Sequence, residues 1–237
     1  MFTGIIEQTG RIVSMEPHGA VQRLTVECPG IAGQLREGDS LAVSGVCLTA
    51  LDVNERYFHA DLAAETIART TLTQLVPGAL VNLELPTAAG APLGGHVVQG
   101  HVDGTGTLVS LVPTRSQESE HFDAATTDWR MAIRVPEALR AYMIPKGSVA
   151  VEGISLTIAA TDIPNGGETI EIAILPLTWS RTNLHSLVAG SAVNLEADIL
   201  IKSAALRNAG GGASSDSGLK SANGFDLTES WLVANGY

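Results

Sequence analysis

Short runs of alternating apolar and polar residues make up most of the first 196 positions of the chain. Such runs occupy 10–14, 24–27, 40–43, 46–51 and 79–85, and glycine, proline, asparagine and aspartate separate them. Evenly spaced short strands with turn residues between them are typical of an antiparallel sandwich or a small closed barrel, and not of a parallel α/β sheet. Three connecting segments, 63–72, 136–143 and 177–184, are each predicted to form about one helical turn.

The hydrophobic period changes after Glu196. A short helix is predicted there, with one face made by Ile199, Leu200, Ala204, Ala205 and Leu206. Residues 208–218 are rich in glycine and serine and predict a flexible linker. Residues 226–236 predict a short terminal helix with Thr228 as N-cap and Gly236 just past its end. Two partners fit the apolar face equally well, namely another copy of the chain and the side of a barrel.

The chain is internally duplicated. Residues 2–14 reappear as 98–110, 40–49 as 148–157, and 69–84 as 181–196. A period of about a hundred residues is too long for a solenoid and indicates a duplicated domain. We therefore predict two domains, at 1–96 and 97–196, followed by a C-terminal segment at 197–237 that holds the helix, the linker and the terminal helix.

The charge, hydropathy and cysteine content of the chain exclude several classes of protein. The 237 residues carry a formal net charge of −11, which argues against a nucleic-acid partner. No apolar run approaches the ~18 residues of a membrane span. The two cysteines, Cys28 and Cys47, lie in apolar surroundings, and the N-terminus lacks the pattern of a signal peptide. We therefore expect a cytoplasmic protein with free thiols and no membrane association.

One strand in each copy carries small residues at alternate positions. These are Gly45, Cys47 and Thr49 in the first copy, and Gly153, Ser155 and Thr157 in the second. With a period of two they share one face, so the other face can pack the barrel while this one contacts a ligand. The structural alternative is that the hydroxyls only satisfy neighbouring backbone groups.

The copies differ at three aligned pairs that carry chemistry: Ile5 against His101, Ser44 against Glu152, and Cys47 against Ser155. The second copy thus gains an imidazole and a carboxylate, and the first a thiol, which suits a reaction between two similar molecules. Each residue also has a structural interpretation. His101 can be hydrogen-bonded at a strand edge, Glu152 can be a solvated turn residue, and Cys47 can be a small core residue.

Other chemistries find little support. His96 and His101 are five positions apart with no further ligand at metal-binding spacing, so we predict no metal site. Residues 94–100 lack the spacing of a phosphate-binding loop, and no Gly-x-Ser-x-Gly elbow is present. No separate cofactor site is visible.

The chain resembles the riboflavin synthase α-chain family over essentially its whole length. The motifs are residues 1–7, 44–49, 94–103 and 153–157, together with the paired Arg-Thr-x-Leu and Val-Asn-Leu-Glu segments, all in the order of the family. The resemblance implies two six-stranded antiparallel Greek-key barrels, a homotrimer joined through C-terminal helices, and lumazine synthase as a potential partner. It also implies a cofactor-free dismutation of two 6,7-dimethyl-8-ribityllumazine molecules to riboflavin and 5-amino-6-(D-ribitylamino)uracil, the last step of riboflavin biosynthesis, at a site between barrels of two subunits.

The resemblance also implies site residues, carried over position by position. Substrate contacts from the first copy are expected at Gly4, Ile5, Ile6, Cys47, Leu48, Thr49, Asp61, Leu62, Ala63, Ala64, Glu65 and Thr66. Contacts from the second copy are expected at Gly100, His101, Val102, Lys146, Ser155, Leu156, Thr157, Ala173, Ile174, Leu175, Pro176, Leu177 and Thr178. For the chemistry we predict His101, Ser40, Cys47 and Glu152 as catalytic residues.

Two departures from the family pattern stand out. Glu152 occupies a place where the family usually has aspartate, and alternation brings it to the pocket only if the strand bulges or turns at Gly153. The segment 202–208 is less apolar than a trimer helix is expected to be.

Two functions compete with the enzyme. The first is a non-catalytic lumazine or flavin carrier of the same fold, which needs only one good pocket. The second, the flavin domain of an oxidoreductase, lacks an accompanying nicotinamide-binding module. Retention of His101, Ser155 and Thr157 favours the enzyme.

Overall fold

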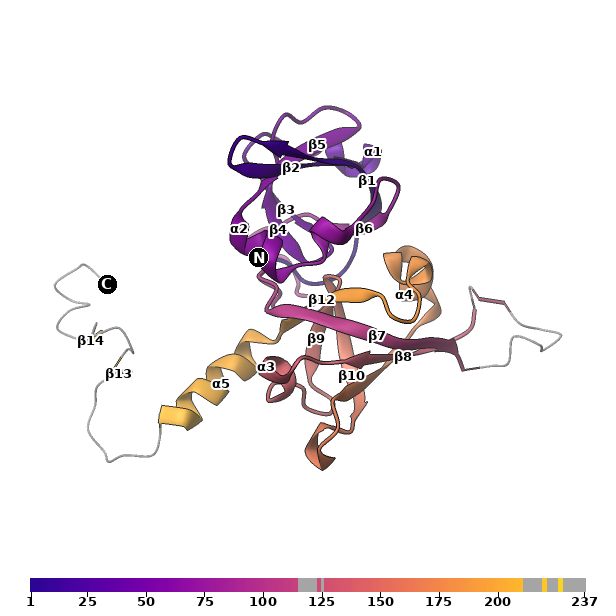
Figure 1. The fold of residues 1–237 in the computed structure, drawn as a ribbon, viewed down its shortest axis with the longest axis vertical. Coiled ribbons are helices and arrows are strands. Elements are labelled where there is room, and N and C mark those ends of the chain that lie inside the picture. Colours follow the sequence, from indigo (N-terminus) through magenta and orange to yellow (C-terminus); the bar gives the residue numbers. More distant parts are fainter. Residues whose placement is uncertain (115–122, 125, 211–218, 221–225, 228–237) are drawn as a thin grey trace. The chain divides into compact units, whose positions relative to one another are not determined.

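The computed structural model describes residues 1–114, 123–124, 126–210, 219–220 and 226–227, and it is mostly antiparallel β-structure. The chain divides into two compact units, Met1–Lys202 and Ser203–Tyr237. Both repeats lie in the first unit, and each folds around its own six-stranded sheet. Figure 1 shows the indigo and purple strands of the first repeat grouped apart from the magenta and orange strands of the second.

The two sheets use equivalent strands in equivalent order. The first runs β4-β3-β6-β1-β2-β5 and the second runs β10-β11-β8-β7-β12-β9 as a closed barrel. The strands of the first are β1 (Gln8–His18), β2 (Val21–Glu27), β3 (Ser40–Val43), β4 (Val46–Thr49), β5 (Tyr57–Leu62) and β6 (Leu80–Glu84). Those of the second are β7 (Gly104–Pro113), β8 (Trp129–Arg134), β9 (Ser148–Val151), β10 (Ile154–Thr161), β11 (Thr169–Ile174) and β12 (Ala192–Ala197).

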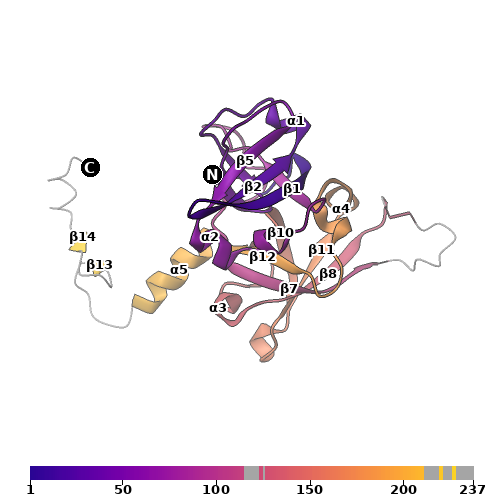
Figure 2. The same ribbon diagram turned by 45° about the horizontal axis from the view of Figure 1, so that its top comes forward.

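Short helices connect the strands, in the three segments that the sequence predicts and also at 29–32 and 163–165. In the two repeats they are α1 (Pro29–Ala32), α2 (Ala64–Arg69), η1 (Leu72–Gln74), α3 (Glu137–Arg140), η2 (Ile163–Asn165), α4 (Pro176–Arg181) and η3 (Asn183–Ser186). In Figure 2, α2 and α4 are seen beside the strands of their own repeats. The helix predicted after Glu196 is α5 (Ile199–Gly210), so 208–210, expected as linker, are helical. Of the tail, β13 (Leu219–Lys220) and β14 (Asp226–Leu227) pair with each other, so the first two residues of the segment predicted as a terminal helix are in a strand, and 228–236 lie outside the described residues.

The first sheet closes differently from the second. In the second barrel, β10 continues to Thr161 and pairs with β11. In the first, β4 ends at Thr49, and only Leu51 meets β5, exchanging both backbone hydrogen bonds with His59 at 2.8 Å. Asp52 follows with φ of 45°, a left-handed conformation that ends the strand.

Each barrel buries its own core. Alternate residues of the strands face inward, so that Leu24, Phe58 and Leu62 in the first barrel and Ile133 and Ile172 in the second are completely buried. A third, smaller cluster of Phe2, Val98, Ala42 and Ala150 joins residues from both repeats. The two repeats therefore share a small packed interface in addition to their separate cores.

Two hairpin turns meet back to back at this interface. Ser44-Gly45 and Glu152-Gly153 all have positive φ, between 44° and 80°, as type I′ turns require. A Cβ on Gly45 would lie 2.7 Å from the backbone nitrogen of Gly153, and one on Gly153 would lie 2.6 Å from that of Gly45. Glycine is needed here for both conformation and space.

Asparagine side chains bind each turn to the opposite barrel. Asn82 Nδ2 donates to the carbonyl of Glu152, and Asn194 Nδ2 donates to the carbonyl of Ser44, each at 2.9 Å. The Val-Asn-Leu-Glu sequence of both copies supplies these equivalent bonds. The interface is thus approximately two-fold symmetric in its backbone and asparagine contacts.

Glu152 breaks this symmetry. Its carboxylate accepts hydrogen bonds from the backbone N–H of Asn194 at 2.7 Å and from Asn183 Nδ2 at 3.0 Å, and it is 4% exposed. The turn expected at Gly153 is present, but it directs Glu152 between the barrels instead of into a pocket. Burial raises the pKa of this carboxyl, against the effect of its bonds from Asn194, Ser44 and Asn183.

Glu152 is expected to make stability fall as pH rises. A native-state pKa above the unfolded value of ~4.3 means that the native chain retains the proton longer. The contribution of Glu152 is therefore complete below about pH 4.3 and is lost as pH rises through its native pKa. We expect the free energy of unfolding of the wild type minus that of Glu152→Gln to decrease in urea titrations as pH rises from about 4.3 through the native pKa of Glu152. A difference that stays flat or increases contradicts this assignment, since all other carboxyls are common to both proteins.

Candidate active site

The leading segment of each repeat crosses the other repeat. Gly4 accepts a hydrogen bond through its carbonyl from the backbone N–H of Ser155 on β10, at 2.8 Å. Gly100 makes the equivalent contact with Cys47 on β4, also at 2.8 Å. Phe2 and Val98 pair with each other between these two crossings. Each predicted ligand-binding strand is therefore covered by a segment from the opposite copy.

Both crossings require glycine. Gly4 has φ of +74°, and a Cβ there would lie 2.6 Å from Cβ of Ser155. Gly100 has φ of +78°, and a Cβ there would lie 2.6 Å from Cβ of Cys47. The small residues on β4 and β10 are thus explained in part by the backbone of Gly100 and Gly4, which lies directly against these strands. The alternation pattern alone did not reveal this contact.

A buried glutamate anchors each leading segment to its own barrel. Glu84, at the end of β6, accepts from the backbone N–H groups of Thr3 and Gly4 and from the Thr3 hydroxyl. Glu196, on β12, accepts from the backbone N–H groups of Gln99, Gly100 and His101 at 2.7 to 3.0 Å. Burial raises the pKa of both carboxyls, against these hydrogen bonds.

The sequence prediction did not include these two glutamates as site residues. The available signal was their repetition at the same place in both copies.

The first pocket lies where residues 100–103 cross β4. It has a volume of about 360 Å³ and is lined by Val46, Cys47, Glu65, Thr66, Arg69, Thr70, Gly100, His101, Val102 and Asp103. Glu65 and Arg69 on α2 form an ion pair at its edge. The pocket brings a thiol, an imidazole, a guanidinium and two hydroxyls together with two carboxylates, a set that can bind a polar heterocycle and transfer protons.

The second crossing contains a serine–histidine contact that the sequence prediction missed. His96 Nδ1 lies 2.7 Å from Ser155 Oγ, and Nε2 is buried without a hydrogen-bond partner among the described residues. Burial lowers the pKa of His96, which favours the neutral ring. The neighbouring Gly95 allows this contact, because a Cβ there would lie 2.8 Å from the Ser155 side chain.

The crossing corrects the sequence-based grouping of side chains. The sequence places Ile5 with Cys47 in one copy and His101 with Ser155 in the other. In the structure His101 lines the pocket of Cys47, whereas Gly4, which precedes Ile5, lies against Ser155. The sequence alone could not show this pairing of His101 with Cys47, because residues of the two copies that are far apart in the chain meet where each leading segment crosses the other repeat.

Ser40 and Thr49 stand opposite each other on β3 and β4. They share the outward side of the sheet with Cys47, because paired residues of antiparallel strands point to the same side. The second copy repeats this arrangement with Ser148 and Thr157. Ser40 is thus placed on the same face as the first pocket.

The remaining predicted contacts differ in their surroundings. Leu48 and Leu156 are buried in the barrels and offer a ligand only backbone groups, and Ile6 packs against the second core. Asp61 forms an ion pair with Arg23 at 2.7 Å, which holds the pKa of its carboxyl below the usual range. Lys146 donates its backbone N–H to Ile158, next to Thr157. The ranges 61–66 and 173–178 cover the ends of β5 and β11 and the starts of α2 and α4.

The described residues contain no cluster of three or more histidine, cysteine or acidic side chains placed to hold a metal ion. Among the helices of the described part of the chain, none is long and apolar enough to span a bilayer.

Comparison with known proteins identifies the family. The lumazine binding domain matches residues 3–86 and 99–198, once in each repeat. The riboflavin synthase of Mycobacterium tuberculosis is 41% identical over 203 residues, covering 85% of this chain and 95% of that protein. The riboflavin synthase of Bacillus subtilis is 40% identical, covering 85% and 87%. The chain belongs to the riboflavin synthase family.

Solved structures agree with this family in fold. LumP complexed with riboflavin has a TM-score of 0.71 and 25% identity, and the match covers 83% of this chain and 99% of that one. LumP complexed with 6,7-dimethyl-8-(1′-D-ribityl) lumazine has a TM-score of 0.69 and 24% identity with the same coverage. Two tandem lumazine-binding barrels are therefore the architecture of the chain.

Gly100→Ala should weaken the fold more than Gly19→Ala. Gly19 also has positive φ, +62°, but a Cβ there meets nothing within 4 Å. Alanine at Gly19 should cost about 1 kcal/mol from its left-handed backbone alone, and overlap with Cys47 should add roughly 1–3 kcal/mol at Gly100. Free energies of unfolding from urea titration measure both. Equal losses in the two variants would show that the crossing tolerates a side chain.

Proposed function

We propose that this protein catalyses the dismutation of two 6,7-dimethyl-8-ribityllumazine molecules to riboflavin and 5-amino-6-(D-ribitylamino)uracil, and is thus a transferase. The observation that carries this proposal is the pair of equivalent crossings, each with a histidine beside a thiol or hydroxyl on the covered strand. Two related sites suit a reaction in which donor and acceptor are the same compound. The named riboflavin synthase relatives support the same activity.

In the first pocket, we assign proton transfer to His101 and substrate contact to Cys47. The exposed imidazole of His101 stands on a segment whose backbone is fixed by Glu196, so its position is defined while its ring remains accessible. A base is needed to remove a proton from the C7 methyl group of one lumazine before the resulting carbanion attacks the second. Ser40 and Thr49, on the same face of the sheet, are assigned to polar contacts with the substrate.

In the second site, His96 and Ser155 form the corresponding pair. A neutral His96 can accept a hydrogen bond from the Ser155 hydroxyl through Nδ1, which would leave the lone pairs of the serine oxygen free to accept a hydrogen bond from the substrate. Glu152 makes no contact with either set of groups, and we assign it to positioning the turn that precedes Ser155.

The reaction needs two bound molecules at close range. We propose that the first pocket of one chain faces the second site of another within a homotrimer, with lumazine synthase as a further partner. Support comes from α5, which begins beside the second barrel through the Lys202–Asp103 ion pair and exposes Leu200 and Leu206 by 68% and 73%. These side chains are available for self-association.

A lumazine or flavin carrier is the second candidate. The likeness to LumP in complex with riboflavin and with the lumazine favours it, because that fold is seen there with ligand bound. The presence of a histidine with a thiol or hydroxyl at both crossings favours the enzyme, since a carrier needs only one binding site.

The purified protein should convert lumazine without metal or other additive. We expect one riboflavin for every two 6,7-dimethyl-8-ribityllumazine molecules consumed, followed by absorbance and confirmed by chromatography of the aminouracil product. Tight stoichiometric binding with no riboflavin formed would instead establish the carrier and refute the dismutase.

His101→Ala should lower turnover by about 100-fold or more, because a positioned general base contributes at least this factor. His101→Gln is the matched variant, since it keeps a hydrogen-bonding side chain but cannot take up the proton at neutral pH. Both variants should lose activity while their thermal unfolding stays that of the wild type. Recovery of the rate in His101→Gln would assign His101 to substrate positioning instead.

A further inference from the structure

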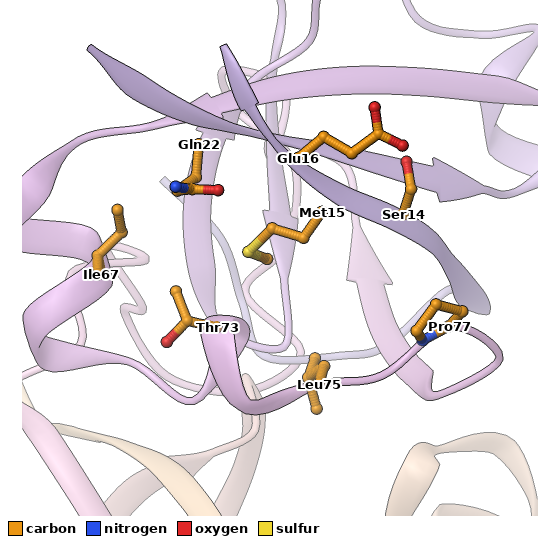
Figure 3. A pocket seen from close by; sticks show the side chains of 8 residues that line it. All are labelled: Ser14, Met15, Glu16, Gln22, Ile67, Thr73, Leu75 and Pro77. Atoms are coloured by element: carbon orange, nitrogen blue, oxygen red, sulfur yellow. The ribbon is translucent and has the colours of Figure 1, made fainter. Parts of the chain in front are cut away.

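A larger cavity lies in the first barrel, apart from both crossings. Its volume is about 630 Å³, within the ~300–1,000 Å³ that small-molecule sites occupy. It is lined by Ser14, Met15, Glu16, Gln22, Ile67, Thr73, Leu75 and Pro77. Figure 3 shows Met15, Gln22, Ile67 and Thr73 around the cavity, with the carboxylate of Glu16 near Ser14.

The second repeat supplies an internal comparison for this space. Pro17 pairs with Gln22 in the first barrel, and the equivalent Pro113 pairs with Trp129 in the second, so Trp129 stands in the place of Gln22. The matching Arg-Thr-x-Leu segments place Trp179 at the position of Ile67. Two positions on the cavity wall of the first barrel are thus tryptophans in the second.

Aromatic rings occupy this place in the second barrel. Trp129 and Trp179 stack with ring centroids 3.7 Å apart and an interplanar angle of 11°. His185, at the position of Thr73, makes an edge-to-face contact with Trp179, with ring centroids 6.4 Å apart. The same backbone framework therefore accommodates stacked planar rings, and in the first barrel smaller or more flexible side chains leave that space open.

The walls of the cavity are suited to a planar ring. Met15, Ile67 and Leu75 are half-buried and pack against the first core, so they form an apolar floor on which a ring can lie. The side chains of Glu16, Gln22 and Thr73 form no hydrogen bond or ion pair with any residue that the structure describes, and they are free to bind polar groups of a ligand. The one formal charge among the lining residues is the carboxylate of Glu16.

We propose that this cavity binds a planar aromatic amine in its cationic form. The ring would take the volume that Trp129 and Trp179 fill in the second barrel, and the ammonium group would face Glu16. The site is separate from the first pocket, because α2 contributes Glu65, Thr66 and Arg69 to that pocket but Ile67 to this cavity. It is thus a second ligand site on the first barrel and does not depend on the proposed reaction.

Tryptamine is a suitable probe, and methionine methyl groups are the reporters. The chain has four methionines, of which Met15 lines the cavity, whereas Met131 and Met143 lie in the second core. In ¹³C-methyl methionine spectra of the full chain, we expect tryptamine to shift the Met15 signal saturably through the ring current. The signals of Met131 and Met143 should stay unchanged. Absence of a saturable Met15 shift overturns the proposal.

Filling variants copied from the second repeat test the location. Ile67→Trp, and separately Gln22→Trp, should close the cavity and abolish the Met15 response, while thermal unfolding shows that each variant is folded. A Met15 response that persists unchanged in a folded variant overturns the assignment.

Charge variants test the class of ligand. Indole-3-acetate should bind about 30-fold more weakly than tryptamine, because one pair of unit charges in water is worth about fivefold and the pair is attractive for one ligand and repulsive for the other. The preference for tryptamine should shrink in Glu16→Gln, because this variant removes the one charge among the lining residues. The net charge of the protein changes by only one unit, so its general attraction for cations is nearly the same in both proteins. An unchanged preference in Glu16→Gln would overturn the cationic ligand.

Discussion

Two buried carboxylates determine how the repeats combine. Glu84 and Glu196 each gather successive backbone N–H groups of their own leading segment, and hydrogen bonds to charged acceptors are stronger than those between neutral groups. With its backbone fixed in this way, each segment presents a glycine to a strand of the other repeat. Each site therefore takes one of its walls from the other copy.

The exchange of segments explains how the two sites differ. Ile5 and His101 are equivalent in sequence, but the crossing brings His101 to the thiol of the first barrel. The second site, which lacks an imidazole at the equivalent position, receives one from His96 next to Ser155. Each site thus has a histidine, in different positions and different surroundings, since His101 is exposed and His96 is half-buried. Such a difference is suited to two bound molecules with different roles.

The repeated segments predicted the two sheets, and the strand alternation predicted the outward face of Cys47 and Thr49, because both follow from local periodicity. The crossing itself was beyond the sequence, since it depends on which strand a glycine-rich segment contacts in space. Glu152 shows the same limit of sequence reasoning. Alternation allowed a turn at Gly153, but it could not show that Asn183 and Asn194 donate hydrogen bonds to the carboxylate. His96 was missed because it was considered only as a metal ligand. The residues named for the site remain predictions until they are tested.

The duplication also shows where the two barrels differ in rigidity. In the second barrel Trp179 holds α4 against Trp129, and β10 continues into a paired edge with β11. In the first barrel, Ile67 of α2 faces a cavity, and the sheet closes through Leu51 and His59 alone. Fewer packed contacts and fewer ladder hydrogen bonds lower the local cost of motion. Because α2 also carries Glu65 and Thr66, one wall of the first pocket stands on the helix that lacks the aromatic stack of α4.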